Sequence, residues 1–347
     1  MDPTLYFPAG AKRYTFGPNH PLRPRRLEML EATLARAAPD LELLQPSPVG
    51  PEAARIVHSD EYVEAVDLLS AGREADLDRF GFASPDNPVF PGMYEAALAY
   101  LAGSCAAAAD VRGGRNRLAF NWTGGLHHAM KSRAAGFCIF NDAAAVCALL
   151  RQTFDRVMYV DIDLHHGDGV QAIFWADPQI LTYSIHESGA TLFPGTGFEH
   201  ETGPAGTSVN VPLPAGTSGD VWLDAFTATF CPMFERFQPG AIVLQAGCDA
   251  HRDDPLGHLE CSVQDWLGAV ETVFATGAPL VVLGGGGYEL ANVHRMWAAA
   301  TLRLHGRHAT ELLDDLSRFE RGNQRERAAT TVQTVLADVL PLIPSIG

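Results

Sequence analysis

The residues with the clearest chemical potential lie in one short run, Asp161-Ile162-Asp163-Leu164-His165-His166-Gly167-Asp168-Gly169. The run directly follows an apolar stretch, Val157-Met158-Tyr159-Val160, that is typical of a buried strand. Residues two apart on an extended chain point to the same side, so Asp161, Asp163 and His165 should share one face. Carboxylates and an imidazole together suit a transition metal. A polar strand-to-helix loop is the plain alternative, but the density of Asp, His and Gly favours a metal site.

A third ligand is available after the predicted buried strand 240–246, where Ala246-Gly247-Cys248-Asp249 follows. Catalytic zinc has three protein ligands and leaves one position open for water, so Asp249 could complete the set. Taken alone, Asp249 would be a helix N-cap or a loop residue. Asp253 and Asp254 follow closely, and the sequence leaves either of them open as the ligand instead.

Two adjacent histidines follow the predicted strand 117–121, in Gly124-Gly125-Leu126-His127-His128. Beside a metal, such a pair offers a general base and an acid or electrostatic partner. Each imidazole needs an acceptor on its other ring nitrogen, and Asp161 and Asp168 fit that role. His166 receives no role. The remaining histidines are interpreted as surface or satisfied core residues: His20, His58, His200, His251, His258, His294, His305 and His308.

A fourth motif, Gly284-Gly285-Gly286-Gly287-Tyr288, follows the predicted strand 279–283. The glycines let the backbone lie close to a pocket, and the Tyr288 hydroxyl could donate to a developing oxyanion. A phosphate-binding loop is the rival interpretation, but no Gly-Lys-Ser/Thr follows. The plain alternative is a tyrosine that begins a packed helix.

The elements that position these motifs alternate between short strands and helices from residue 115 onward. The apolar patterns predict strands at 117–121, 156–162, 179–185, 208–212, 240–246 and 279–283. Helices are predicted at 26–38, 93–109, 142–152, 168–176, 219–236, 262–276, 289–304 and 326–341, the last as a packing helix, with a loop at 80–92. Continuous apolar strands alternating with helices predict a parallel sheet covered on both faces. Ligands of such sheets bind beyond the carboxyl ends of the strands, where all four motifs lie.

Charge and apolar content argue against a nucleic-acid-binding protein and against a membrane protein. The 347 residues carry a formal charge of −16, from 41 acidic and 25 basic side chains. Nucleic-acid binding needs Lys and Arg to neutralise phosphates, so this balance argues against it. The longest apolar runs are too short to cross a bilayer, and Met1-Asp2-Pro3-Thr4 does not resemble a signal peptide. We therefore expect a cytoplasmic protein without a membrane partner.

The six cysteines form no Cys-x-x-Cys pair and are expected to be buried apolar residues, not disulfides or a zinc cage: Cys105, Cys138, Cys147, Cys231, Cys248 and Cys261.

Taken together, five segments resemble the zinc-dependent histone deacetylase family of the arginase/deacetylase superfamily. They are Gly-Gly-Leu-His-His-Ala, Gly-Phe-Cys-Ile-Phe-Asn-Asp, Asp-Ile-Asp-Leu-His-His-Gly-Asp-Gly, Phe-Pro-Gly-Thr-Gly and Gly-Gly-Gly-Gly-Tyr. The likeness covers residues 14–304, and Leu126 with the segment 86–93 is most similar to the bacterial acetoin-utilisation branch, itself similar to class I. It implies one domain over 1–347, a three-layer α/β/α structure with a central, mainly parallel eight-stranded sheet.

The resemblance also implies roles for individual residues. Zinc would be bound by Asp163, His165 and Asp249, the tandem histidines would pair with Asp161 and Asp168, and Tyr288 would bind the carbonyl oxygen. Substrate would be contacted by Asp86, Gly136, Phe137, Phe193 and Leu256, and Arg26 would line an internal acetate channel. One potassium ion would be held by Asp161, Asp163, His165, Ser184 and Ile185. A second, less securely matched because Thr207 replaces a common Tyr, would use Phe174, Asp177, Ile180 and Thr207.

The implied activity is removal of acetyl groups from protein N-ε-acetyl-lysine, with zinc, or ferrous iron in the cell, as the metal. An acyl-CoA synthetase is the substrate implied for the acetoin branch; no oligomeric state is predicted. The nearest alternative is an acetylpolyamine amidohydrolase, which would favour acidic residues at the tunnel mouth where Leu256 stands. An arginase-like binuclear hydrolase and an inactive acetyl-lysine binder are further alternatives.

Overall fold

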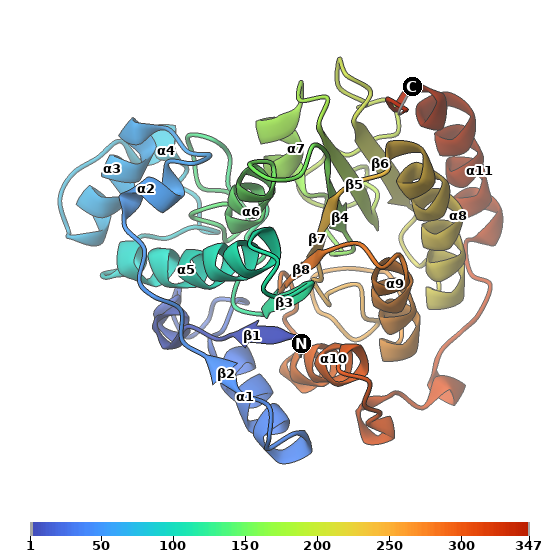
Figure 1. Cartoon of the computed structure of the whole chain (residues 1–347), viewed down its shortest axis with the longest axis horizontal. Coiled ribbons are helices and arrows are strands. Elements are labelled where there is room, and N and C mark those ends of the chain that lie inside the picture. Colours follow the sequence, from blue (N-terminus) through green and yellow to red (C-terminus); the bar gives the residue numbers. More distant parts are fainter. Residues whose placement is uncertain (1–2, 346–347) are drawn as a thin grey trace.

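The computed structural model describes residues 3–345 and contains one sheet of eight strands, in the order β2-β1-β3-β8-β7-β4-β5-β6 (Figure 1). Every pairing between neighbouring strands is parallel. The strands are β1 (Thr4–Tyr6), β2 (Leu43–Leu44), β3 (Leu118–Asn121), β4 (Val157–Asp161), β5 (Ile180–Glu187), β6 (Ser208–Leu213), β7 (Ala241–Gln245) and β8 (Leu280–Leu283).

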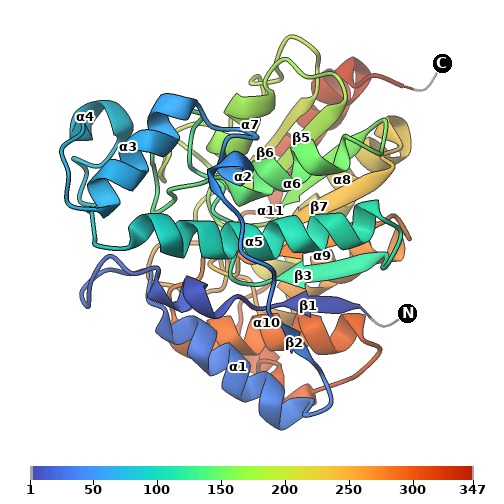
Figure 2. The same ribbon diagram turned by 60° about the vertical axis from the view of Figure 1, so that its left-hand side comes forward.

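The helices surround this sheet on both sides (Figures 1 and 2). They are α1 (Arg25–Ala37), α2 (Pro51–Ala54), α3 (Asp60–Ser70), α4 (Leu77–Phe80), α5 (Met93–Arg112), α6 (Asp142–Leu150), α7 (Asp168–Phe174), α8 (Gly219–Phe237), α9 (Val263–Ala275), α10 (Leu290–Leu304) and α11 (Arg325–Thr334). Short 3-10 turns occupy Ala9–Arg13, Thr310–Leu312, Leu316–Arg318 and Leu340–Leu342, and a π turn occupies Val335–Val339.

Two apolar cores lie on opposite faces of the sheet. Buried residues of α2 to α7 form one core, and those of α1 and α8 to α11 form the other. Strand β4 supplies both, because Val157 and Tyr159 join the first core while Met158 and Val160 join the second. A strand buried on both faces must be apolar at every position, which is why β4 shows no polar alternation. The predicted three-layer α/β/α arrangement is confirmed.

The sequence patterns located six of the eight strands and the long helices within a few residues. The expected "mainly parallel" sheet is parallel throughout the described chain. Strands β1 and β2, of three and two residues, are too short to show a periodic pattern, and they pair only at one edge of the sheet. The predicted helix at 326–341 begins as α11 and continues through the π turn to the 3-10 turn that contains Pro341.

The other sequence expectations have mixed outcomes. All six cysteines are free; four are buried, whereas Cys105 and Cys231 are only partly so. Between residues 3 and 345, no helix has the length and apolarity to cross a membrane. Met1 and Asp2, on which the signal-peptide expectation partly rests, lie outside the described residues.

Candidate active site

The four chemical motifs follow strands that are neighbours in the sheet. The sheet order β3-β8-β7-β4 places the Gly124–His128 loop, the glycine run, the Asp249 loop and the Asp161–Gly169 run side by side. All four strands run in the same direction, so their carboxyl ends share one edge. Motifs that are more than a hundred residues apart in the chain therefore meet at one place.

Three of these side chains form a compact cluster. Ligand atoms of Asp163, His165 and Asp249 all lie within 4.8 Å of one another, and all three residues are buried. Backbone N–H groups fix the carboxylates: Leu164 donates to Asp249 Oδ1 at 3.0 Å, and Gly286 donates to Asp163 Oδ2 at 2.7 Å. Two carboxylates and one imidazole with fixed orientations are a donor set that fits a divalent transition metal.

The electrostatics of the cluster favour a cation. Burial, followed by the neighbouring Asp163 carboxylate, raises the pKa of Asp249 to about 7. Burial opposes a charge on His165, but its bonds to Asp163 and Asp249 outweigh it and raise the pKa of the imidazole to about 10. The cluster thus retains a proton to balance two buried carboxylates. A bound divalent cation would take the place of that proton.

Two glycines leave room for these carboxylates. A Cβ at Gly247 would lie 1.9 Å from Asp163 Oδ2, and a Cβ at Gly286 would lie 2.0 Å from Asp249 Oδ2. Any side chain at either position would displace a candidate ligand. Gly247 before Asp249 and Gly286 in the fourth motif are therefore needed for close approach of the backbone to the cluster.

The tandem histidines lie beside the cluster. His127 Nδ1 lies 2.8 Å from Asp161 Oδ2, and His128 Nδ1 lies 2.7 Å from Asp168 Oδ1, the pairing that the family resemblance implied. Their Nε2 atoms face each other at 3.0 Å, and His127 Nε2 is 3.8 Å from Asp163 Oδ1. Both imidazoles are buried and thus held in fixed orientations.

A contact between two Nε2 atoms at 3.0 Å needs one proton between them. Burial lowers the pKa of both imidazoles, but at His127 the Asp161 and Asp163 carboxylates outweigh it and raise the pKa to about 9. At His128, burial and then the adjacent His127 lower the pKa to about 4. The pair is therefore polarised, with a protonated His127 and a neutral His128 whose Nε2 can accept a proton.

Tyr288 is buried near the cluster and is held through its backbone. Its N–H donates to Asp254 Oδ2 at 2.8 Å, and Asp254 Oδ1 accepts from the Leu256 N–H at 3.1 Å. Burial, then Asp249 and Asp163, raises the pKa of Tyr288, so its hydroxyl stays protonated and can donate. Of the alternatives left open by the sequence, Asp254 has this orienting task, whereas Asp253 is near Arg252 and Arg318.

An Asn-Asp pair at the start of α6 orders the tandem-histidine loop, a role that sequence reasoning missed. The Asp142 carboxylate accepts from the backbone N–H groups of Gly125 and Leu126 at 2.8 to 3.0 Å. The Asn141 side-chain amide donates to the backbone oxygens of His127 at 2.9 Å and Ala129 at 3.0 Å. The signal in the sequence was the polar Asn-Asp pair that directly follows apolar residues in the motif Gly-Phe-Cys-Ile-Phe-Asn-Asp.

Aromatic side chains lie around the tandem histidines. The Phe193 ring is 5.1 Å from that of His128 and is 44% exposed, while the Phe137 ring is 5.7 Å from that of Tyr288. A Cβ at Gly136 would lie 2.5 Å from the His128 ring, so this position allows no side chain. These residues, predicted to form the tunnel, therefore lie close together beside the tandem histidines and Tyr288.

His20 also belongs to this neighbourhood, although the sequence analysis dismissed it as a surface or core residue. Its ring lies 4.4 Å from that of Phe137, and its Nε2 is 3.3 Å from the backbone oxygen of Asp86. Burial lowers the pKa of His20. Asp86 itself is exposed, so its carboxylate is accessible from solvent.

Arg26 is hydrogen-bonded to the backbone of the glycine run. Its guanidinium donates to the Gly285 backbone oxygen at 2.7 Å and lies 5.2 Å from the centre of the Trp297 ring. The side chain is buried. It therefore supports the backbone that precedes Tyr288 from within the protein.

The residues predicted to hold potassium lie in two places next to β5. Ser184 pairs with Asp161 across β4 and β5, and its hydroxyl lies 2.8 Å from His186 Nδ1; Ile185 is the next residue. At the second place, Thr207 donates to the Asp177 backbone oxygen at 2.9 Å, and Asp177 donates to that of Phe174. Ile180 begins β5 close to this turn. Potassium binding at either place stays a prediction.

His166, left without a role, is not in the candidate metal cluster. Its Nδ1 lies 2.9 Å from the Thr196 hydroxyl and its Nε2 3.2 Å from Gln171 Oε1. Burial lowers its pKa. A neutral His166 therefore links the loop with the candidate metal ligands to the loop that carries Phe193.

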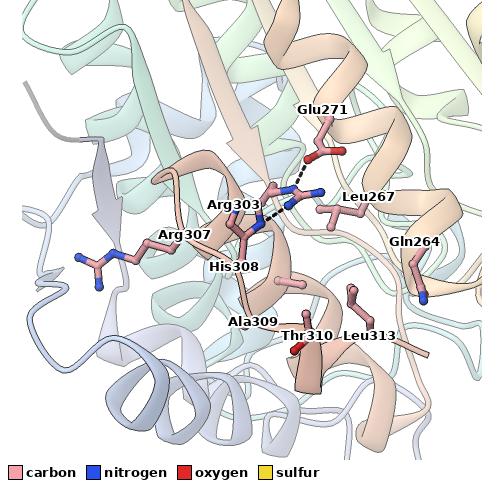
Figure 3. Close-up of a pocket in the computed structure, with 10 residues that line it drawn as sticks. Gln264, Leu267, Glu271, Arg303, Arg307, His308, Ala309, Thr310 and Leu313 are labelled. Atoms are coloured by element: carbon pink, nitrogen blue, oxygen red, sulfur yellow. Dashed lines mark hydrogen bonds and ion pairs between the residues drawn. The ribbon is translucent and has the colours of Figure 1, made fainter. Parts of the chain in front are cut away.

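A separate pocket of about 110 Å³ lies between α9, α10 and the following turn (Figure 3). Arg303 within it contacts Glu271 and His308. None of its lining residues belongs to the candidate active site. Its chemistry is therefore independent of the site at the strand ends.

Comparison with known proteins assigns the family. The model of the histone deacetylase domain matches residues 20–304. The acetoin utilization protein AcuC of Bacillus subtilis is 36% identical over 88% of this chain and 82% of its own length. Histone deacetylase 3 of Oryza sativa is 38% identical over 83% of this chain, which spans only 58% of that protein.

Solved structures agree with this assignment. A crystal structure of a histone deacetylase homologue from Aquifex aeolicus has a TM-score of 0.88 and 28% identity, and the match covers 97% of this chain and 100% of the other. A histone deacetylase homologue complexed with SAHA gives the same values. The chain is an amidohydrolase that belongs to the histone deacetylase family and is similar to its class I members.

Proposed function

We propose that this enzyme removes acetyl groups from N-ε-acetyl-lysine side chains of proteins and releases acetate, using zinc. One observation carries the proposal: the buried Asp163, His165 and Asp249 cluster lies beside a polarised histidine pair. A metal-ion donor set next to a proton acceptor and a proton donor is what amide hydrolysis requires.

Asp163, His165 and Asp249 would hold the zinc ion, which would supply a Lewis acid to polarise the amide carbonyl and to lower the pKa of water. His128 Nε2 accepts the proton of the attacking water, since its Nδ1 is directed at Asp168. Protonated His127, oriented by Asp161, stabilises negative charge, and the attacking water takes the place of its Nε2–H at the single Nε2 lone pair of His128. The Tyr288 hydroxyl donates to the carbonyl oxygen as its charge grows, and a protonated histidine gives its proton to the departing lysine amine.

The residues at the proposed tunnel mouth favour an acetyl-lysine side chain of a protein over an acetylpolyamine as the substrate. Leu256 is apolar and half-buried, and the Phe137 and Phe193 rings suit the methylene chain of an acyl-lysine. The exposed Asp86 carboxylate can accept hydrogen bonds from peptide N–H groups, which a polyamine lacks. An acyl-CoA synthetase acetylated on lysine is the substrate class we propose, and the two potassium positions near β5 are proposed to support the metal loop.

The experiment is one substrate panel: acetyl-lysine peptides, longer acyl-lysine peptides and acetylpolyamines, each with and without a chelator. We expect chelator-sensitive turnover on acetyl-lysine peptides, restored by added zinc. The Asp249→Asn variant is the matched control, because it keeps the shape of the side chain and removes one anionic ligand. Preferential turnover of acetylpolyamines would reverse the substrate assignment, and turnover that survives the chelator would refute the metal role.

A further inference from the structure

Glu187, the last residue of β5, is a buried carboxylate with no task in the reaction described above. Only 1% of its surface is exposed, yet its carboxylate makes three hydrogen bonds. A buried carboxylate is costly unless its oxygens are fully paired, so these bonds define its position closely.

The three bonds join two loops at the opening of the site. Oε1 accepts from the Thr191 hydroxyl at 3.0 Å and lies 2.9 Å from His258 Nδ1, while Oε2 accepts from the His258 backbone N–H at 2.8 Å. Thr191 lies two residues before Phe193, and His258 lies two residues after Leu256. One carboxylate therefore holds both loops that bear walls of the proposed tunnel.

Glu187 is itself fixed to the metal-binding loop. Its backbone N–H donates to the Leu164 oxygen at 3.0 Å, and Leu164 stands between Asp163 and His165. The loop at 254–258 also packs tightly there, because a Cβ at Gly257 would lie 2.1 Å from Leu164 Cδ2. The contacts of Glu187 with Leu164, Thr191 and His258 thus set the distance from the candidate metal loop to the Phe193 loop and to the Leu256 loop.

The His258 side chain is exposed to solvent and is also held in place. Its side chain is 63% exposed, although its ring and its backbone N–H both contact Glu187. An unrestrained exposed side chain would lose rotamer freedom on contact with a ligand. Here that freedom is already restricted, which suits a residue that meets the substrate outside the tunnel.

We propose that Glu187 is a positioning residue that fixes the Phe193 and Leu256 loops, and that His258 contributes to recognition of the peptide at the tunnel mouth. This inference rests on the proposed deacetylase function. It assigns both residues to substrate affinity and not to the chemical step.

The test compares Glu187→Gln, His258→Ala and the double variant, with Glu199→Gln as the matched control. In Glu187→Gln the side-chain shape is kept, but the negative charge that strengthens the bonds to Thr191 and His258 is lost. We expect KM for acetyl-lysine peptides to rise about tenfold, as for loss of one hydrogen bond to a charged group, with kcat and zinc content nearly unchanged. Because the two residues share their contacts, the double variant should resemble Glu187→Gln, not the product of the two effects.

Hydrogen–deuterium exchange gives a reading that does not depend on activity. In Glu187→Gln, segments 188–196 and 254–258 should both exchange faster, while Glu199→Gln should exchange as the unaltered protein does. An unchanged KM in folded Glu187→Gln, multiplicative KM effects in the double variant, or exchange altered in neither segment would overturn the proposal. Absence of turnover in the unaltered enzyme would instead refute the deacetylase function, and the exchange result would still decide whether Glu187 holds the loops.

Discussion

Asp142 provides the most demanding test of how the active-site loop is supported. Its carboxylate accepts from the N–H groups of Gly125 and Leu126, and the Ser104 hydroxyl donates to it at 2.5 Å. Asp142→Ala would leave two buried backbone N–H groups without an acceptor. Each costs about 1–3 kcal/mol, so the free energy of unfolding should fall by about 2–6 kcal/mol. That is a large part of the about 5–15 kcal/mol that stabilises most proteins.

Asp142→Asn separates the loss of charge from the loss of an acceptor. Its amide oxygen can still accept from Gly125 and Leu126, and the Ser104 hydroxyl can turn to accept from the new NH₂ group. Burial raises the pKa of Asp142, so a neutral amide also avoids the cost of burying a charge. We therefore expect a loss of only about 1 kcal/mol.

Equilibrium urea unfolding of the metal-free variants is the appropriate assay, because bound metal would add its own stabilisation. Asp224→Ala is the control, since it removes an exposed carboxylate that pairs only with Arg325 on the surface and should cost less than about 1 kcal/mol. If Asp142→Ala is as stable as this control, or if the Asn variant is as unstable as the Ala variant, the reasoning about unsatisfied N–H groups is wrong.

Two further predictions concern catalysis and pH. Tyr288→Phe should lower kcat by about 10²–10³, the effect of removing one oxyanion donor, with the melting temperature and zinc content unchanged; near-normal turnover would reject the role of the hydroxyl. Burial lowers the pKa of His58 from 6.5 to about 4, while its Nε2 accepts from the Asn141 N–H. Below pH 6.5 the unfolded chain binds a proton that the folded protein does not, so stability should fall between pH 6.5 and 4, by up to about 3 kcal/mol from this group. Unfolding free energies at pH 7 and 4.5 should differ less in His58→Gln, whose amide oxygen remains an acceptor; an equal pH dependence in both proteins would exclude this contribution.

The linear sequence determined the layered α/β class, because continuous apolar strands and amphipathic helices are properties of local sequence. It also marked the polar motifs that follow β3, β4, β7 and β8, since a buried strand followed at once by Asp, His or Gly is a local pattern. The resemblance of the five motifs to one family added the expected roles. None of these observations needs the strand order.

The tertiary structure decided which residues meet. The choice of Asp249 over Asp254 for the cluster depends on where β7 lies beside β4, and the order β3-β8-β7-β4 was not written in any local pattern. The supporting roles of Asp142, Asp254 and Glu187 could not be predicted from local patterns for the same reason. These residues act through hydrogen bonds to other loops, and only the folded chain brings those partners close. The local motifs after β3, β4, β7 and β8 supplied the reactive groups, whereas long-range pairing of buried polar atoms fixed their geometry.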